Sequence, residues 1–197
     1  QDGIRPLNQE NLSSLAQEVA QLERLVADLR LLSQSDAGAL DIQLAPMNLS
    51  ESLESRLNDA DRWLEESGLT LTTALADDVM IRGDAQRLRQ LWSNLLDNSC
   101  AYTQPPGKLS VSLICERGDA VITWQDSAPG VPEEELSRLT ERLYRVEGSR
   151  NRASGGSGLG LSIASALVTA HGGTLTPSAS PLGGLTWTLR FPLLTVS

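Results

Sequence analysis

The segment RASGGSGLGL, residues 152–161, is crowded with glycines and runs directly into an apolar stretch. The apolar residues after it recur at helical spacing and are followed by two glycines as a stop signal, so we predict a helix over about residues 158–171. Glycine lets backbone N–H groups turn toward a bound group, and a helix start offers unpaired N–H donors and positive potential. These properties suit phosphate, although a glycine-rich loop alone also fits a plain flexible turn.

Two asparagines lie one helical turn apart in the stretch LWSNLLDNSCAYT, at Asn94 and Asn98. This spacing puts both amides on one face of a helix, opposite the apolar residues Leu88, Trp92 and Leu95. An amide oxygen is a suitable hard ligand for Mg²⁺, which keeps several waters and takes few protein ligands. Asparagines that are merely solvated give the same pattern, so the pair alone leaves both interpretations open.

An acidic residue, Asp126, ends the predicted strand AVITWQD and opens the turn DSAPG. A carboxylate at this point can accept a hydrogen bond from an exocyclic amine such as that of adenine, and the small residues beside it admit a flat ring. Taken alone, the turn is equally a hairpin corner. The three groups of residues therefore carry a functional interpretation only together.

In their order along the chain, the three groups resemble the N, G1 and G2 boxes of sensor histidine kinases: Asn-x-x-x-Asn on a helix, Asp-x-x-x-Gly after a strand and Gly-x-Gly-x-Gly before a helix. The segment LTERLYRVEGSRNR resembles the family's F box and ATP lid, and GGLTWTLRFP resembles its last strand with the G3 turn. The string YRVEGSRNRASGGSGLGL is most similar to members that sense envelope stress. The resemblance spans nearly the whole chain.

The resemblance implies ATP or ADP and Mg²⁺ as cofactors, and it gives each matching residue a role. Asn98 would coordinate Mg²⁺, Asn94 would lie beside the phosphates, and Asp126 would bind the adenine amine. Asn94, Asn98 and Arg145 are the implied catalytic residues, with Arg145 stabilising charge on the transferred phosphoryl group. The glycines would serve both as phosphate loop and as lid hinge. The implied nucleotide-binding residues are Asn94, Asn98, Tyr102, Asp126, Gly130, Tyr144, Arg145, Arg152, Gly156, Gly158, Leu159 and Gly160, with Asn98 as the metal ligand.

Four residues depart from the family's pattern. Ala128 stands at the usual middle glycine of the G1 box, and Ala101 stands where a Lys or Arg directed at phosphate is common. Thr140 and Leu143 occupy the two usual phenylalanine positions of the F box. These departures bear on lid anchoring and on affinity, and they leave the pocket itself in place.

A long amphipathic helix is predicted near the start of the chain, over about residues 8–33. Its apolar residues alternate steps of three and four, as in a heptad seam: Leu12, Leu15, Val19, Leu22, Val26 and Leu29. Such a helix needs a partner, which is either the body of its own chain or a second helix. We favour a second copy or a missing helix, and expect the homodimer through residues 9–33 to be weak in this chain.

The resemblance assigns residues 1–40 to part of a dimerisation and phosphotransfer domain and residues 41–197 to a catalytic ATP-binding domain. The family's phosphoacceptor histidine has no counterpart here, so we expect the chain to begin after it. The segment SQSDAGALDIQLAP contains Gly and Pro without a sustained helical period and predicts a linker between the two parts.

The rest of the pattern predicts an α+β fold. Helices are expected after the capping residues Asn48 and Asp84, and strands are expected in LTLTTAL, VMIR, KLSVSLICE and AVITWQD and over about residues 173–178 and 185–191. Helices and strands do not alternate strictly, which favours a mixed, largely antiparallel sheet with helices on one face. With the resemblance, this is a Bergerat-type ATP-binding α/β sandwich preceded by a long amphipathic helix.

Composition excludes several classes of function. The chain has 197 residues, a formal net charge of -9 and two cysteines. This length suits one domain with a substantial core plus a smaller element, and the acidic balance argues against a nucleic-acid surface. Two cysteines are too few for a disulfide scaffold, and a single histidine, His171, leaves no His-based triad. No apolar run is long enough to span a bilayer.

We therefore expect the kinase domain of a two-component sensor, which transfers the ATP γ-phosphoryl group to a histidine absent from this chain and then to a response regulator aspartate. The chain itself is expected to be soluble, as the cytoplasmic part of an inner-membrane sensor whose membrane segments lie elsewhere. The alternative is a nucleotide-gated regulatory module on the same fold without histidine phosphorylation. A gyrase- or Hsp90-type ATPase ranks third. Because His171 is expected at the far end of the glycine-loop helix, we predict that the chain does not phosphorylate itself.

Overall fold

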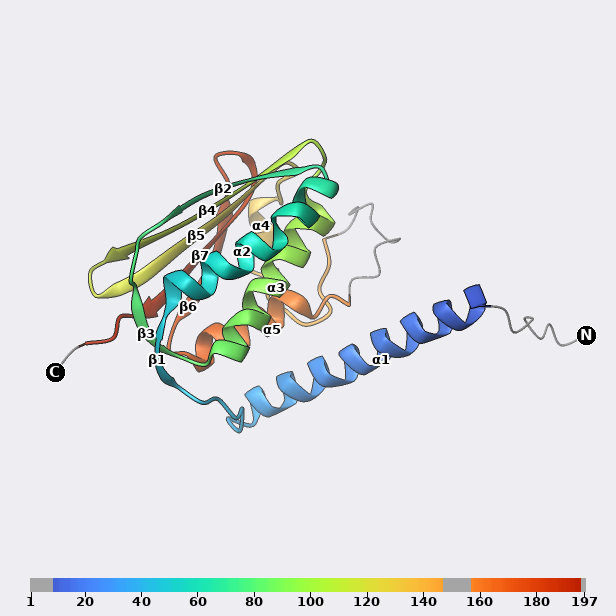
Figure 1. Ribbon diagram of the computed structural model, residues 1–197, viewed down its shortest axis with the longest axis horizontal. Helices are drawn as coiled ribbons and strands as arrows, with labels where there is room; N and C mark the ends of the chain where they lie inside the picture. The colour runs from blue at the N-terminus through green and yellow to red at the C-terminus, as the bar shows by residue number, and fades with distance from the viewer. Residues whose placement is uncertain (1–8, 147–156, 196–197) are drawn as a thin grey trace, which may run out of the picture.

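The computed structural model describes residues 9–146 and 157–195. Helices cover one face of a twisted sheet, and a long N-terminal helix projects from this body (Figure 1). The described elements are α1 (Gln9–Asp36), β1 (Ala45–Asn48), α2 (Leu49–Glu66), β2 (Leu69–Leu75), β3 (Met80–Gly83), α3 (Ala85–Tyr102), β4 (Gly107–Glu116), β5 (Asp119–Ser127), α4 (Glu133–Leu136), α5 (Gly160–Ala170), β6 (Thr174–Ala179) and β7 (Gly183–Pro192).

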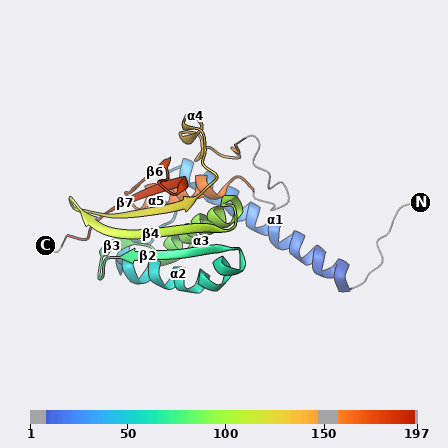
Figure 2. The same cartoon turned by 90° about the horizontal axis from the view of Figure 1, so that it is seen from above.

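The main sheet has five strands in the order β2-β4-β5-β7-β6. The pair β2–β4 is parallel, and the other three pairs are antiparallel. Figure 2 shows α2, α3 and α5 together on one side of this sheet. The expected mixed, largely antiparallel sheet with helices on one face is confirmed.

Alternation along the strands places the core between the sheet and the helices. In β4 the side chains of Leu109, Val111 and Leu113 are fully buried, while the residues between them face the other side. The helices contribute their apolar stripes, and three of the four tryptophans, Trp92, Trp124 and Trp187, are at most 1 % exposed. This core fixes α3 and α5 against the strands that end at the candidate site.

The predicted helix caps are present. The Asn48 side chain accepts a hydrogen bond from the N–H of Glu51 at 3.2 Å. The Asp84 carboxylate accepts from the N–H groups of Gln86 at 3.0 Å and Arg87 at 3.1 Å. Because these bonds satisfy donors that helix starts leave unpaired, the two caps fix where α2 and α3 begin.

The predicted linker is only partly irregular. Its first residues continue α1 as far as Asp36, and its last residues, Ala45 and Pro46, begin strand β1. Strand β1 pairs antiparallel with β3 in a separate two-stranded sheet, with Ala45 opposite Gly83. The linker prediction was wrong for these residues because β1 is stabilised by a partner far along the chain, which local composition does not reveal.

Helix α1 has two different faces. The predicted seam is exposed on all six residues, from Leu12 at 52 % to Val26 at 65 %. Near the helix end, Leu31 and Leu32 are buried, and α1 contacts α5 there. The helix is thus attached to the body only by its C-terminal part. Among the described helices, none combines the length and apolar character needed to cross a bilayer.

Candidate functional site

Helix α3 carries the two asparagines at the border of its buried face. Both Asn94 and Asn98 are half-buried rather than solvated, so the prediction that they lie opposite the apolar stripe was wrong. The Nδ2 atom of Asn94 is buried and has no hydrogen-bond partner among the described residues. A buried amide nitrogen without a partner loses its hydrogen bonds to water and gains none from the protein. A ligand that supplies an acceptor at this place would remove that cost.

The start of α5 lies beside these asparagines. Helices α3 and α5 pack against each other, and the N–H of Asp84, which precedes α3, donates to Nε2 of His171, which follows α5, at 3.0 Å. The helices therefore run in opposite directions. Because both rise about 1.5 Å per residue, Gly160 at the start of α5 is level with about residue 95 of α3, between Asn94 and Asn98. The structure thus brings two of the three sequence groups together.

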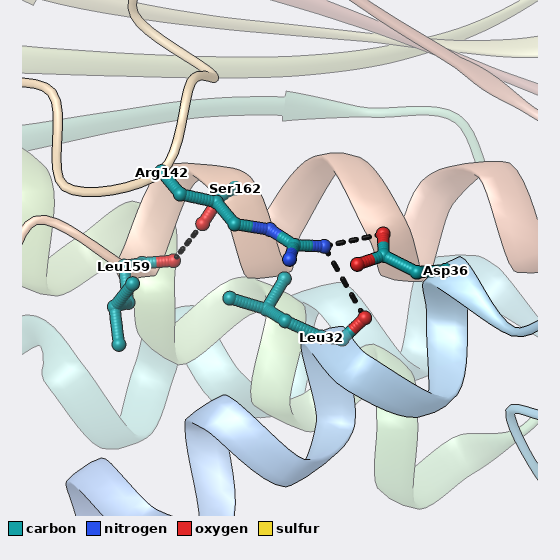
Figure 3. Close-up of polar contacts among 5 residues, drawn as sticks. All are labelled: Leu32, Asp36, Arg142, Leu159 and Ser162. Carbon is teal, nitrogen blue, oxygen red and sulfur yellow. Dashed lines mark hydrogen bonds and ion pairs between the residues drawn. The ribbon is translucent and has the colours of Figure 1, made fainter.

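The N-terminus of α5 has the features expected of an anion site. Leu159 precedes the helix without a side-chain cap on its N–H groups, and a Cβ added at Gly160 would meet nothing within 4 Å. The hydroxyl of Ser162 donates instead to the carbonyl of Leu159 at 2.8 Å (Figure 3). The first amides of α5 thus remain available to a ligand, as at phosphate-binding helix starts.

Leu143, in the predicted F box and lid segment, and Gly158, in the predicted lid hinge, meet in a tight backbone contact. The N–H of Leu143 donates to the carbonyl of Gly158 at 3.1 Å. Gly158 has a φ of +70°, and a Cβ there would lie 3.2 Å from Cα of Leu143. Glycine is required at this position by both conformation and space. Arg152 and Gly156, two other expected site residues, lie outside the described residues.

Tyr144 and Arg145 follow this contact and are both half-buried. The guanidinium of Arg138 lies 4.1 Å from the centre of the Tyr144 ring, and the ring also packs against the core. This stacking holds the backbone that carries Arg145. Tyr102, at the end of α3, is 37 % exposed.

Arg142, in the same segment, connects the site to α1. Its Nη2 donates to the carbonyl of Leu32 at 3.2 Å and forms an ion pair with Asp36, as Figure 3 shows. The last turn of α1 holds no basic residue of its own, so Arg142 supplies the positive charge that a helix C-terminus favours. Sequence reasoning did not single out Arg142, because its partners lie 106 and 110 residues away.

Asp126 is the buried acid of the site. Its side chain is only 5 % exposed, and its Oδ1 accepts a hydrogen bond from the N–H of Leu185 at 2.6 Å. Burial raises the pKa of Asp126 from 3.8 to about 6, against the opposing effect of that hydrogen bond. Asp126 is connected to α3 through Trp124, whose Nε1 donates to the hydroxyl of Ser99 at 3.0 Å, next to Asn98.

Gly130 lies close to the start of β7. A Cβ at Gly130 would be 3.1 Å from the carbonyl oxygen of Gly183. The N–H of Gln104, just beyond α3, donates to the carbonyl of Ala128 at 3.0 Å, which ties the turn after β5 to the end of α3. The third sequence group therefore also meets α3. Sequence reasoning assigned no role to Gly184 and Leu185, which contact Asp126 directly, although the GG pair at 183–184 was visible.

Other candidate positions are less informative. Among the described residues, no group of three or more His, Cys, Asp or Glu side chains is arranged to hold a metal ion. A groove of about 380 Å³ lies between α2 and the start of α3. Its lining contains none of the expected site residues: Met47, Asn48, Glu51, Ser52, Ser55, Arg56, Asp59, Ala85 and Arg89.

Comparison with known proteins agrees with this geometry. Residues 83–195 match the family model described as histidine kinase-, DNA gyrase B-, and HSP90-like ATPase. The chain is 46 % identical over 193 residues to the signal transduction histidine-protein kinase BaeS of Escherichia coli (strain K12). The alignment covers 98 % of this chain and 41 % of BaeS, so the chain spans about two fifths of that relative.

Solved structures show the same fold. Acinetobacter baumannii histidine kinase AdeS superposes with a TM-score of 0.80 at 23 % identity, over 98 % of this chain and 89 % of that one. Histidine kinase ThkA in complex with response regulator protein TrrA has a TM-score of 0.72 at 17 % identity, over 98 % of this chain and 53 % of that one.

Proposed function

Because the chain belongs to the histidine kinase-, DNA gyrase B- and HSP90-like ATPases and contains the ATP-binding catalytic domain of a sensor histidine kinase, we propose that its parent protein is a phosphotransfer enzyme. The parent would move the γ-phosphoryl group of ATP to a histidine other than His171, and from there to an aspartate of a response regulator. The main support for this proposal is that three features lie around one end of α3: its asparagine pair, the open start of α5 and the buried Asp126. A regulatory module without histidine phosphorylation is not favoured, since BaeS is a named histidine kinase.

Each proposed residue contacts a different part of the nucleotide. Asp126 accepts a hydrogen bond from the adenine amine, and Gly130 leaves room beside the ring. Asn94 and the first N–H groups of α5, from Gly160 onward, meet the phosphates. Leu159 adjoins them at the N-cap, where its own N–H donates to Oγ of Ser157 at 3.2 Å. Arg145 stabilises charge that develops on the transferred phosphoryl group. Tyr102, Tyr144, Arg152, Gly156 and Gly158 complete the proposed nucleotide-binding set.

Mg²⁺ is part of the proposal. Asn98 is the proposed ligand, because its half-buried amide lies one turn beyond Asn94 and an amide oxygen suits this cation. Magnesium, when bound, supplies positive charge to the phosphate oxygens. The unpartnered nitrogen of Asn94 supports the phosphate beside this cation, since a phosphate oxygen is the acceptor that it lacks.

Titration with a fluorescent ATP analogue tests the site. We expect Mg²⁺-assisted binding in the micromolar range, and a loss of at least about 100-fold when Asn98→Ala and Asp126→Ala are combined, because each removes a hydrogen bond to a charged or desolvated group. The matched control replaces the same residue types on the exposed side of α2, as Asn58→Ala with Asp61→Ala. Binding that survives the first pair of substitutions would refute the site assignment.

We also propose that residues 1–40 are part of a dimerisation and phosphotransfer domain and that residues 41–197 are the catalytic domain. The parent is proposed to be an inner-membrane sensor of envelope stress with this part in the cytoplasm, on the similarity to BaeS. The response regulator partner is supported by the fold shared with ThkA, which was solved with TrrA.

Self-association through α1 is the expected consequence of its exposed seam. A helix with six exposed apolar residues at heptad spacing buries them when it pairs with another copy. Light scattering at increasing concentration should show weak dimers, and Val19→Glu should abolish them. Ala20→Glu adds the same charge beside the seam and should leave them. A single monomeric mass at millimolar concentration would contradict this prediction.

A further inference from the structure

Strands β5 and β7 lose their regular pairing at the candidate adenine-binding residue. Gln125 lies opposite Thr186, and Ser127 lies opposite Gly183. Between these pairs β5 has one residue, Asp126, whereas β7 has two, Gly184 and Leu185. This is a β-bulge, in which the extra residue interrupts the ladder and redirects nearby groups. We call Gly184 and Leu185 the β7 bulge.

The bulge turns a backbone donor toward a side chain. The N–H of Leu185 donates to Oδ1 of Asp126 at 2.6 Å in a buried position. In a regular antiparallel ladder this donor would bond to a carbonyl of the neighbouring strand. A hydrogen bond between an N–H and a carboxylate is among the stronger ones in proteins, and burial strengthens it further. One oxygen of Asp126 is therefore fixed by the protein itself.

The other bulge residue leaves space for that contact. A Cβ at Gly184 would overlap Oδ1 of Asp126 and the carbonyl oxygen of Ser127, and would lie 2.6 Å from the carbonyl oxygen of Asp126. Two of these three atoms belong to the backbone of β5 and cannot move aside cheaply. The carboxylate can approach Leu185 because residue 184 has no side chain.

We infer that the β7 bulge is the positioning element for adenine recognition: it fixes Oδ1 of Asp126 with the Leu185 N–H and leaves the second carboxylate oxygen to accept from the exocyclic amine of ATP. This inference rests on the proposed function of the same site. Gly184 and Leu185 act through Asp126 and are positioning residues, not catalytic ones. The Leu185 N–H also favours the ionised, acceptor-only carboxylate, in opposition to burial, which raises its pKa.

A ligand that lacks the amine isolates this interaction. Purine riboside triphosphate has the triphosphate and ring of ATP but no exocyclic amine. Wild-type protein should prefer ATP by about 10- to 100-fold, the range expected for a hydrogen bond to a charged group. In Gly184→Ala the preference should fall to about onefold, with a smaller change in the affinity for the purine analogue, because the phosphate contacts remain.

Gly173→Ala is the matched control. A Cβ at Gly173 would overlap the carbonyl oxygen of Arg190 in β7. This variant therefore crowds the backbone of a neighbouring strand, as Gly184→Ala crowds that of β5, but at the end of β7 that is farther from Asp126. It should lose stability and keep the preference for ATP. Retention of the preference in Gly184→Ala, or its loss in Gly173→Ala, would overturn the inference. Wild-type protein that binds neither nucleotide would instead refute the proposed function.

A measurement on the wild-type protein tests the inference even if the glycine variants fail to fold. In ¹H–¹⁵N spectra of the nucleotide-free protein, the Leu185 amide proton should move downfield as Asp126 ionises, because its hydrogen bond acquires a charged acceptor. The same signal should not titrate in Asp126→Asn. A Leu185 amide that is insensitive to pH in the wild type would contradict the inference independently of any nucleotide.

Discussion

Asp126→Asn is expected to raise the free energy of unfolding of the nucleotide-free protein at pH 8 by about 2 to 3 kcal/mol, which is the free energy of a pKa shift of about two units. Burial raises the pKa of Asp126 from 3.8 to about 6, so the folded protein disfavours the charged form. The neutral amide lacks this penalty, and its oxygen can still accept from the N–H of Leu185. The same variant should lose most of its affinity for ATP.

The sign of the pH dependence follows from the raised pKa. The unfolded chain ionises Asp126 near 3.8 and the folded protein near 6. The contribution of Asp126 to stability is therefore fully present below pH 3.8 and is lost as the pH rises through 6. The advantage of Asp126→Asn over the wild type should grow over this interval and be constant above it.

Urea denaturation between pH 4 and 8 measures this difference. Asp61→Asn, on the exposed side of α2, is the control and should change stability by less than about 0.5 kcal/mol. An advantage of Asp126→Asn that does not vary with pH would contradict the argument. If Asp126→Asn is more stable than the wild type and binds ATP more weakly, then Asp126 lowers the stability of the fold and serves nucleotide binding.

Incubation with γ-labelled ATP is expected to leave this chain without acid-labile label. His171, its only histidine, is 5 % exposed and has both ring nitrogens engaged. Its Nε2 accepts from the N–H of Asp84 at 3.0 Å, and its Nδ1 lies 2.7 Å from the carbonyl oxygen of Leu167. It also lies at the opposite end of α5 from Gly160, about 16 Å away at 1.5 Å per residue, which in-line phosphoryl transfer does not tolerate.

The structure gives His171 a role in stability instead. The ring joins the end of α5 to the start of α3 and packs edge-on against Phe191. His171→Ala should lower the free energy of unfolding by about 2 to 4 kcal/mol, because it removes buried contacts and leaves the Asp84 N–H unpaired. Burial also lowers the pKa of His171, so its contribution is fully present above its ordinary 6.5 and is lost as the pH falls through the lowered value.

Autoradiography after acid and base treatment separates phosphohistidine from other products. Label on this chain alone that is lost in His171→Ala would show that the acceptor has been misassigned. A supplied fragment carrying the family's phosphoacceptor helix should be labelled slowly by this chain, which is the positive control for an active nucleotide site.

Much of the fold could be predicted from the sequence because the relevant interactions are local. The caps at Asn48 and Asp84 bond to groups within three residues. The alternation of buried and exposed residues in β4 and the heptad spacing of apolar residues in α1 each repeat within one element. The three groups of candidate site residues were recognisable for the same reason, since each lies within a few positions of the chain. Periodicity also predicted the long amphipathic helix, and the structure shows that the body of the same chain does not cover its seam.

The tertiary structure decided what depends on partners far along the chain. Strand β1 exists because β3 pairs with it, and Asn94 is half-buried because other elements pack around α3. Gly160 comes level with the asparagines because His171 bonds to Asp84 across 87 residues. The Leu185 N–H reaches Asp126 across 59 residues only because β7 has one residue more than β5 at the bulge. The sequence by itself determined which residues have suitable chemistry, and long-range packing, which has no local periodicity, decided which of their atoms are held in place, buried or left without a partner.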